Sequence, residues 1–317
     1  MKIVFLDAKT IGDDIDLSGF DSLGEVTKYN FTTPEEAPER VKDADVLIIN
    51  KVPINENTVG TAKNLKLVCV TATGTNNLDK DYLDSHKIAW RNVAGYSTET
   101  VTQHTFAMLF YLLEKLRYYD DYVKDGNYIN DTSFTHFAEH FSEINGKTWG
   151  IIGLGAIGLW TARMAKGFGM KVIANSRHKK AGPQYDGIEQ VSMEEIFERS
   201  DVISIHCPHT KETENLLNRE AFAKMKDGVI IINTARGIII DEEALLEALE
   251  SRKVYMAGLD VVANEPPQYQ IPLMQSPYTF ITSHIAWQPK AARLRAVDLA
   301  VKNFRSYLEG MPTSVIN

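Results

Sequence analysis

The chain has 317 residues, of which 44% are apolar and 24% are charged, a profile typical of a globular protein and not of a disordered or fibrous one. Its 34 basic and 42 acidic side chains give a formal net charge of −8, which argues against nucleic acid or an anionic membrane as a partner. The length favours two ordinary domains, and a small molecule is the expected partner.

The start of the chain and its cysteines indicate where the protein works. The first residues enter a strand-like run without the basic and apolar segments of a secretory signal, and no stretch is long enough to span a bilayer. A cytoplasmic protein is therefore predicted. Cys69 and Cys207 both lie in apolar runs and are expected to be core thiols in strands. The histidines show no regular ligand spacing, so no metal is predicted.

The first third of the chain alternates apolar runs with helix-like segments. The runs at residues 3–6, 46–49 and 67–70 are typical of buried strands in a parallel sheet flanked by helices. A long helix is predicted from Thr98, because apolar residues recur there at helical spacing as far as Leu112. This helix is expected to join the two domains.

A polar stretch at residues 118–145 is rich in aromatic side chains and fits no strand pattern. One interpretation is an arm that binds a second copy of the chain, which would make the protein a homodimer. The other is that the rings pack within their own chain. The rings are Tyr118, Tyr119, Tyr122, Tyr128, Phe134, Phe137 and Phe141.

The most specific local pattern is a glycine fingerprint in the middle of the chain. An apolar run at residues 149–152 opens into Gly153, Leu154, Gly155, Ala156, Ile157 and Gly158, and a helix-like segment follows. In such a motif the first glycine permits a tight turn, the second lets backbone approach a pyrophosphate, and the third lets the helix pack on the strand. Gly153, Gly155, Ala156, Ile157 and Gly158 are therefore predicted to bind a dinucleotide.

The residue after the second strand of such a fold normally carries a carboxylate that binds the ribose 2′-hydroxyl. Here the position is Ser176, and Arg177 begins a basic run through residue 180. Arginine binds phosphate well, so the pattern predicts NAD or NADP as the cofactor, with competence for the 2′-phosphate of NADP. The competing interpretation is a solvated turn.

Apolar runs at residues 171–174, 202–206, 229–233, 254–261 and 279–282 complete a doubly wound domain. Polar residues follow these strands, at the edge where open α/β sheets bind ligands. Pro208, Thr234 and Ala235 are expected to contact the cofactor. Arg236, Glu265 and His284 are expected to converge on one crevice, as a reaction on a 2-oxo acid requires, although each residue alone has an ordinary structural explanation.

The amphipathic segment at residues 290–308 is expected to return to the first domain. The predicted fold is thus α/β with two doubly wound parallel-sheet domains. A Rossmann cofactor domain at residues 98–287 is inserted into a flavodoxin-like substrate domain formed by residues 1–97 and 288–317.

Four motifs, at residues 153–158, 234–237, 260–265 and 283–287, resemble the D-isomer-specific 2-hydroxyacid dehydrogenase family over essentially the whole chain. The resemblance implies that Arg236 binds the substrate carboxylate and carbonyl and that His284 donates the proton in reduction. It also implies that Glu265 holds the histidine and that Asp260 holds the nicotinamide side of the cofactor. Ser176 departs from the acidic residue usual in the family.

Within that family, residues 71–79, 92–105 and 284–287 look most like glycerate dehydrogenases, also called hydroxypyruvate reductases. This likeness implies reduction of hydroxypyruvate or glyoxylate to the D-hydroxy acid. Backbone N–H groups of Thr73, Gly74 and Thr75 are expected to bind the substrate carboxylate opposite Arg236. Lys51 and Trp287 are further substrate candidates, against the alternatives of a solvated lysine and a packed tryptophan.

Two other functions remain open. One is reduction of a different 2-oxo acid, such as pyruvate. The other is a non-catalytic protein that senses NAD(P), as corepressor-like relatives in this family suggest.

Overall fold

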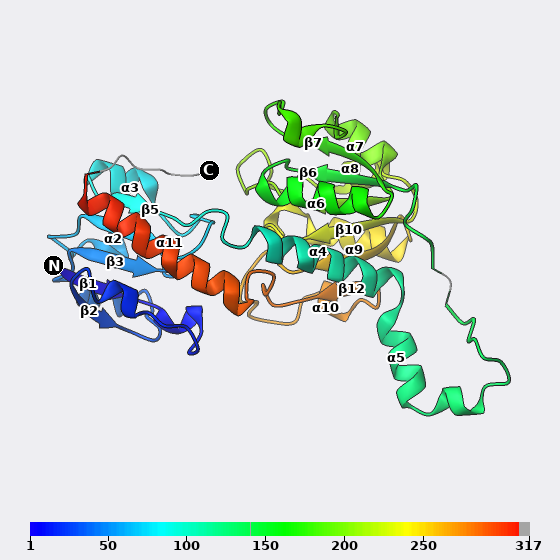
Figure 1. Ribbon diagram of the computed structural model, residues 1–317, viewed down its shortest axis with the longest axis horizontal. Coiled ribbons are helices and arrows are strands. Elements are labelled where there is room, and N and C mark those ends of the chain that lie inside the picture. The colour runs from blue at the N-terminus through cyan, green and yellow to red at the C-terminus, as the bar shows by residue number, and fades with distance from the viewer. Residues whose placement is uncertain (140, 311–317) are drawn as a thin grey trace. The chain divides into compact units, whose positions relative to one another are not determined.

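The computed structural model describes residues 1–139 and 141–310 and divides the chain into two compact units (Figure 1). The terminal unit contains Met1–Ser97 and the residues from Trp287 onward, and the middle unit contains Thr98–Ala286. Trp287 therefore belongs with the chain ends, and not with the middle segment to which the sequence assigned it. Residues 311–317 of the predicted substrate domain lie outside the described residues.

The terminal unit is built on a five-stranded parallel sheet with the order β2-β1-β3-β4-β5, the flavodoxin-like order. Alternate residues of its inner strands enter two cores, one on each face of the sheet, which is why these strands read as unbroken apolar runs. Helix α11 packs Ala292, Ala296 and Phe304 into one of these cores. The elements are β1 (Lys2–Phe5), β2 (Glu25–Lys28), α1 (Ala37–Arg40), β3 (Val46–Ile49), α2 (Glu56–Val59), β4 (Leu67–Val70), α3 (Lys80–Ser85), β5 (Ala89–Arg91) and α11 (Lys290–Leu308).

The middle unit is built on a seven-stranded parallel sheet with the order β12-β11-β10-β9-β6-β7-β8. The order reverses between β6 and β9, and a ligand is expected at such a switch point. The strands are β6 (Thr148–Ile152), β7 (Lys171–Asn175), β8 (Glu189–Gln190), β9 (Val202–Ile205), β10 (Val229–Asn233), β11 (Val254–Leu259) and β12 (Thr279–Ile281). The helices are α4 (Thr98–Leu113), α5 (Leu116–Lys124), α6 (Ala156–Gly167), α7 (Met193–Arg199), α8 (Arg219–Lys224), α9 (Glu242–Glu250) and α10 (Pro272–Gln275).

These two sheets confirm the predicted fold class. The strands that apolar runs did not predict are β2, β5 and β8, and each forms an edge of its sheet. Edge strands have a neighbour on one side only and tolerate polar side chains, so they carry a weak sequence signal. All three short interior runs predicted in the first third of the chain are strands.

The aromatic stretch packs within its own chain only in part, and its role as a dimer arm stays a prediction. Figure 1 shows α5 and the segment after it extending away from the sheet of the middle unit. Tyr122 stacks on His136 with ring centroids 3.8 Å apart, and the Tyr118 hydroxyl lies 2.9 Å from Nε2 of the same histidine. Phe134 and Phe137, however, are 90% and 81% exposed. Packing within the chain therefore accounts for some rings and leaves others uncovered.

The cysteines differ in position. Cys69 is buried in β4, and burial raises its thiol pKa to about 12. Cys207 is partly exposed and lies two residues beyond β9, so its assignment to a strand was wrong. Burial raises the pKa of Cys207 to about 11.

Within residues 1–139 and 141–310, no helix has the length and apolar character needed to cross a membrane. Over the same ranges, no group of three or more His, Cys, Asp or Glu side chains has the arrangement of a metal site.

Candidate functional site

The glycine fingerprint forms the turn between β6 and α6, at the switch point of the middle sheet. Gly153 has φ = +99°, and a Cβ there would lie 2.5 Å from the backbone nitrogen of Cys207, which follows β9. A side chain is thus excluded by backbone conformation and by space. A Cβ on Gly158 would overlap the carbonyl oxygen of Gly153, so this glycine lets α6 pack against the turn.

The N-terminus of α6 fits an anionic ligand. Gly155 is the N-cap and supplies no capping side chain, and the position of a Cβ on Gly155 is open, with no described atom within 4 Å. The first N–H groups of a helix lack acceptors within it and carry partial positive charge. Ala156, Ile157 and Gly158 could therefore hold a pyrophosphate, as the sequence predicts, and Gly155 leaves room for its approach.

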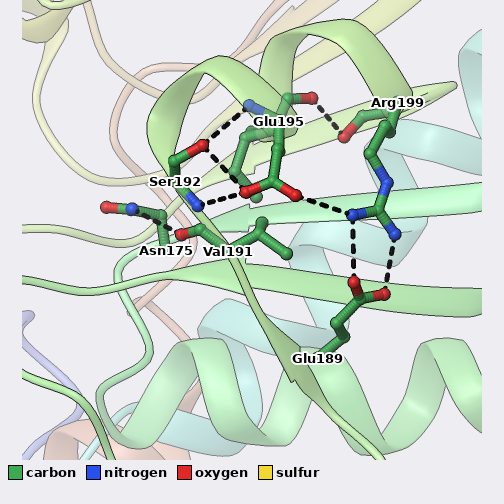
Figure 2. Close-up of polar contacts among 8 residues, drawn as sticks. Asn175, Glu189, Val191, Ser192, Glu195 and Arg199 are labelled. Atoms are coloured by element: carbon green, nitrogen blue, oxygen red, sulfur yellow. Dashed lines mark hydrogen bonds and ion pairs between the residues drawn. The ribbon is translucent and has the colours of Figure 1, made fainter.

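A polar contact ties the end of β7 to the segment between β8 and α7. Figure 2 shows the amide of Asn175 donating to the carbonyl oxygen of Val191, at 2.9 Å. Ser192 and Glu195 form a capping box at the start of α7, and Arg199 binds both carboxylate oxygens of Glu189 at 2.7 and 3.0 Å (Figure 2). The Asn175 hydrogen bond thus connects the strand end that leads directly into Ser176 with this framework.

Ser176 and Arg177 follow the end of β7. The Ser176 hydroxyl donates to the carbonyl oxygen of His178 at 2.8 Å. The Arg177 side chain is 65% exposed, and its guanidinium lies 4.0 Å from the carboxylate of Glu212 in the loop after β9. Pro208 belongs to the same loop, where its carbonyl oxygen accepts the hydroxyl of Thr213.

Asn233 braces the turn that carries Arg236. Its side chain is fully buried at the end of β10, accepts the backbone N–H of Ala235 and donates to the carbonyl oxygen of Arg236, both at 2.9 Å. The backbone of Gly237 then touches Val262, so closely that a Cβ would overlap it. Sequence reasoning placed Asn233 at a strand end but missed this positioning role.

Glu265 and His284 contact each other although 19 positions separate them. Nδ1 of His284 lies 2.8 Å from one carboxylate oxygen of Glu265, and the other oxygen accepts the backbone N–H of Val262 at 3.1 Å. Because an ionised carboxylate only accepts, Nδ1 carries the proton in this contact and Nε2 is the atom able to exchange a proton with a ligand. Both side chains are partly exposed, at 26% and 32%.

Asp260 holds the turn that presents His284. Its buried carboxylate accepts the Thr282 hydroxyl at 2.6 Å and the backbone N–H groups of Ile285 and Ala286 at 2.8 and 2.9 Å. Nε2 of His104 lies 3.5 Å away. Burial raises the pKa of Asp260, but hydrogen bonds from His104, Thr282, Ala286 and Ile285 outweigh it and leave the pKa below its ordinary value. The sequence did not reveal this anchoring role, and a contact with nicotinamide stays a prediction.

The remaining substrate candidates lie in the terminal unit. The turn at Thr73, Gly74 and Thr75 is held by Asn92, whose amide donates to the carbonyl oxygen of Thr73 at 2.7 Å. The backbone N–H of Lys51 donates to Asp7 at 2.6 Å, and Trp287 packs against the core of this unit. Their contacts with a substrate stay predictions.

Comparison with known proteins assigns the family. Residues 106–286 match the model of the D-isomer specific 2-hydroxyacid dehydrogenase NAD binding domain. The chain is 38% identical to a hydroxypyruvate reductase of Blautia hydrogenotrophica, over 100% of both chains, and 38% identical to a glycerate dehydrogenase of Methylorubrum extorquens, over 99% and 98% of the two chains. A solved acyclic imino acid reductase in complex with NADPH and D-Arg has a TM-score of 0.89 and 30% identity over 100% of both chains. The chain belongs to the D-isomer-specific 2-hydroxyacid dehydrogenase family.

Proposed function

We propose that this protein is an oxidoreductase that reduces hydroxypyruvate or glyoxylate to the D-2-hydroxy acid with a nicotinamide cofactor. The single observation that carries the proposal is the contact between His284 and Glu265, in the same unit as a glycine turn that fits a pyrophosphate. The hydroxypyruvate reductase and glycerate dehydrogenase among the relatives support the choice of substrate.

The catalytic roles follow from the chemistry of these side chains. A reduced nicotinamide, when bound, supplies the hydride to C2 of the substrate. His284 donates a proton from Nε2 to the carbonyl oxygen as negative charge develops on it, while Glu265 holds the imidazole through Nδ1. Arg236 binds the substrate carboxylate through its guanidinium. Oxidation of the hydroxy acid runs in reverse and requires a neutral His284.

The finer cofactor assignment is that NADP is accepted as well as NAD. Ser176 provides no negative charge that would repel a 2′-phosphate, and the Arg177 guanidinium is exposed beside it. The relative solved with NADPH supports this proposal. The proposed cofactor contacts also include Gly153, Pro208, Thr234, Ala235 and Asp260.

The two units are proposed to divide the work. The middle unit would bind the cofactor, and the terminal unit would contribute Thr73, Gly74, Thr75, Lys51 and Trp287 to substrate binding. A homodimer that covers Phe134 and Phe137 is proposed because large exposed aromatic side chains are typical of interfaces. The cytoplasmic location stays a prediction.

The test is steady-state kinetics on hydroxypyruvate, glyoxylate and pyruvate, each with NADH and with NADPH, followed by absorbance of the reduced cofactor. We expect higher kcat/KM with hydroxypyruvate or glyoxylate than with pyruvate. A preference for pyruvate would instead assign a D-lactate type of reaction. Tight nucleotide binding with no turnover of any acid would support the non-catalytic sensor.

A further inference from the structure

An ion pair crosses the end of the strand that carries the glycine turn. Arg177 follows β7, and Glu212 lies in the loop after β9. Strand β6 lies between these two strands in the sheet, so the 4.0 Å contact between Arg177 and Glu212 spans the carboxyl end of β6. Both partners thus belong to the nucleotide edge of the middle unit.

The loop fixes the backbone at Glu212. The N–H of Thr210 donates to the hydroxyl of Thr213 at 2.7 Å, and that hydroxyl donates to the carbonyl oxygen of Pro208 at 2.8 Å. The N–H of Glu214 closes the turn on the carbonyl oxygen of Thr210 at 3.0 Å. The carboxylate of Glu212 is therefore directed from a well-defined turn.

The ion pair is weak enough for a ligand to take the place of the Glu212 carboxylate on Arg177. The side chains of Arg177 and Glu212 are 65% and 78% exposed, and an exposed pair at this distance is weak. The pKa of Glu212 is lowered by the Thr210 hydroxyl, by its own backbone N–H and by the charges of Arg177 and Lys211, so the carboxylate is ionised at neutral pH. A ligand phosphate could replace it on the guanidinium.

We propose that Glu212 sets the preference between NADH and NADPH, because its carboxylate competes with the 2′-phosphate for Arg177 and repels that phosphate. The inference rests on the proposed dinucleotide function and adds a specificity-determining residue to it. A ligand without the 2′-phosphate does not need Arg177 in this way, so the competition acts on NADPH alone. Loss of the carboxylate at position 212 should therefore raise the use of NADPH relative to NADH.

The experiment compares Glu212→Gln with the matched control Glu214→Gln. Glu214 belongs to the same turn, but its carboxylate lies 3.8 Å from Nε2 of His209, whereas Glu212 is the residue that pairs with Arg177. Isothermal titration with adenosine 2′,5′-bisphosphate and with 5′-AMP measures binding directly, and kinetics give the ratio of kcat/KM for NADPH and NADH. We expect Glu212→Gln to tighten binding of the bisphosphate by roughly threefold to tenfold and to raise that ratio by a similar factor.

The double variant Arg177→Gln/Glu212→Gln should lose the gain, and Glu214→Gln should show none. The inference is overturned if folded Glu212→Gln shows no gain, if Glu214→Gln or the double variant gains equally, or if 5′-AMP tightens as much as the bisphosphate. Those outcomes leave the proposed function intact wherever NADH is still turned over. If neither the unmutated protein nor any variant bound either nucleotide, that result would instead contradict the proposed function.

Discussion

The terminal and middle units share a parallel-sheet architecture but differ in what lies at the switch point of the sheet: a carboxylate in one and open space in the other. In the terminal unit the switch point lies between β1 and β3, and Asp7, which follows β1, fills it. The Asp7 carboxylate accepts the backbone N–H groups of Asn50, Lys51 and Val52 at 2.8, 2.6 and 3.2 Å. In the middle unit the corresponding position carries Gly153 and Gly155, and the space beside Gly155 is open.

The difference shows that the sheet order creates an anion-binding position and that the residues after the first strand decide what occupies it. One unit supplies its own carboxylate, which accepts hydrogen bonds from backbone N–H groups. The other presents the N-terminus of α6 to a ligand. Similar topology therefore yields a structural position in one unit and a candidate binding site in the other.

The largest expected effect tests whether the chemistry belongs to the middle unit. In His284→Ala, kcat for hydroxypyruvate should fall by about 10²- to 10⁴-fold, because no proton donor then faces the developing charge. The KM for the reduced cofactor should change little. His86→Ala, which alters an exposed histidine of the terminal unit, is the control. If His284→Ala reduced hydroxypyruvate with the same kcat as the unmutated protein, His284 would not be the proton donor.

The second effect concerns the carboxylate that fills the terminal switch point. Asp7→Asn places an amide N–H against backbone donors and should lower the free energy of unfolding by about 2 kcal/mol. Urea unfolding at neutral pH measures the change. Asp13→Asn changes an exposed residue paired with Lys9, and its free energy of unfolding should stay close to that of the unmutated protein. Equal stability of the two variants would show that Asp7 is not a structural anion.

The third effect separates binding from stability in the middle unit. Gly155→Ala meets no described atom within 4 Å and has a negative φ, so the free energy of unfolding should hardly change. The new methyl group would occupy the approach to the α6 N-terminus, and the Kd for NADH should rise by about tenfold or more. Titration calorimetry gives the Kd. Gly167→Ala, which also meets open space in α6, should bind normally.

The fourth effect concerns the framework of Figure 2. Ser192→Ala removes the capping box of α7 and should lower the free energy of unfolding by about 1 kcal/mol. Asn55→Ala removes the corresponding box of α2 in the terminal unit and should have a similar effect. Ser192→Thr should retain the stability in urea unfolding, and a loss as large as that of Ser192→Ala would argue against capping.

The smallest effect is an opposite pH response of the two buried aspartates. Burial raises the pKa of Asp7 despite the N–H bonds of Lys51, Asn50 and Val52, whereas the pKa of Asp260 is lowered. Stability linked to Asp7 therefore falls as pH rises from 3.8 through its folded pKa. Stability linked to Asp260 is present above 3.8 and is lost as pH falls through its folded pKa.

Carboxyl carbon NMR, assigned with Asp7→Asn and Asp260→Asn, would follow both titrations. Asp7 should still titrate above pH 3.8 and Asp260 only below it. The reverse order of the two pKa values would contradict the dominance of burial at Asp7 and of hydrogen bonding at Asp260.

The sequence by itself determined the fold class and the interior strands, because buried parallel strands must be apolar on both faces. The glycine fingerprint also predicted a turn at Gly153, and the structure gives this residue φ = +99°, which few residues other than glycine adopt. The polar residues at the strand ends, including Arg236 and His284, could be selected as site candidates because the carboxyl ends of parallel strands lie at one edge of the sheet.

Only the tertiary structure decided which of those side chains touch. The pair of Arg177 with Glu212 and the filling of the terminal switch point by Asp7 join distant positions that no motif connected. The family resemblance implied that Glu265 holds His284, and the structure supplied the atoms in contact and their distance of 2.8 Å. Such contacts depend on the order of strands in the sheet, on loop conformation and on side-chain rotamers. None of these has a local sequence pattern, whereas apolar periodicity and glycine turns do.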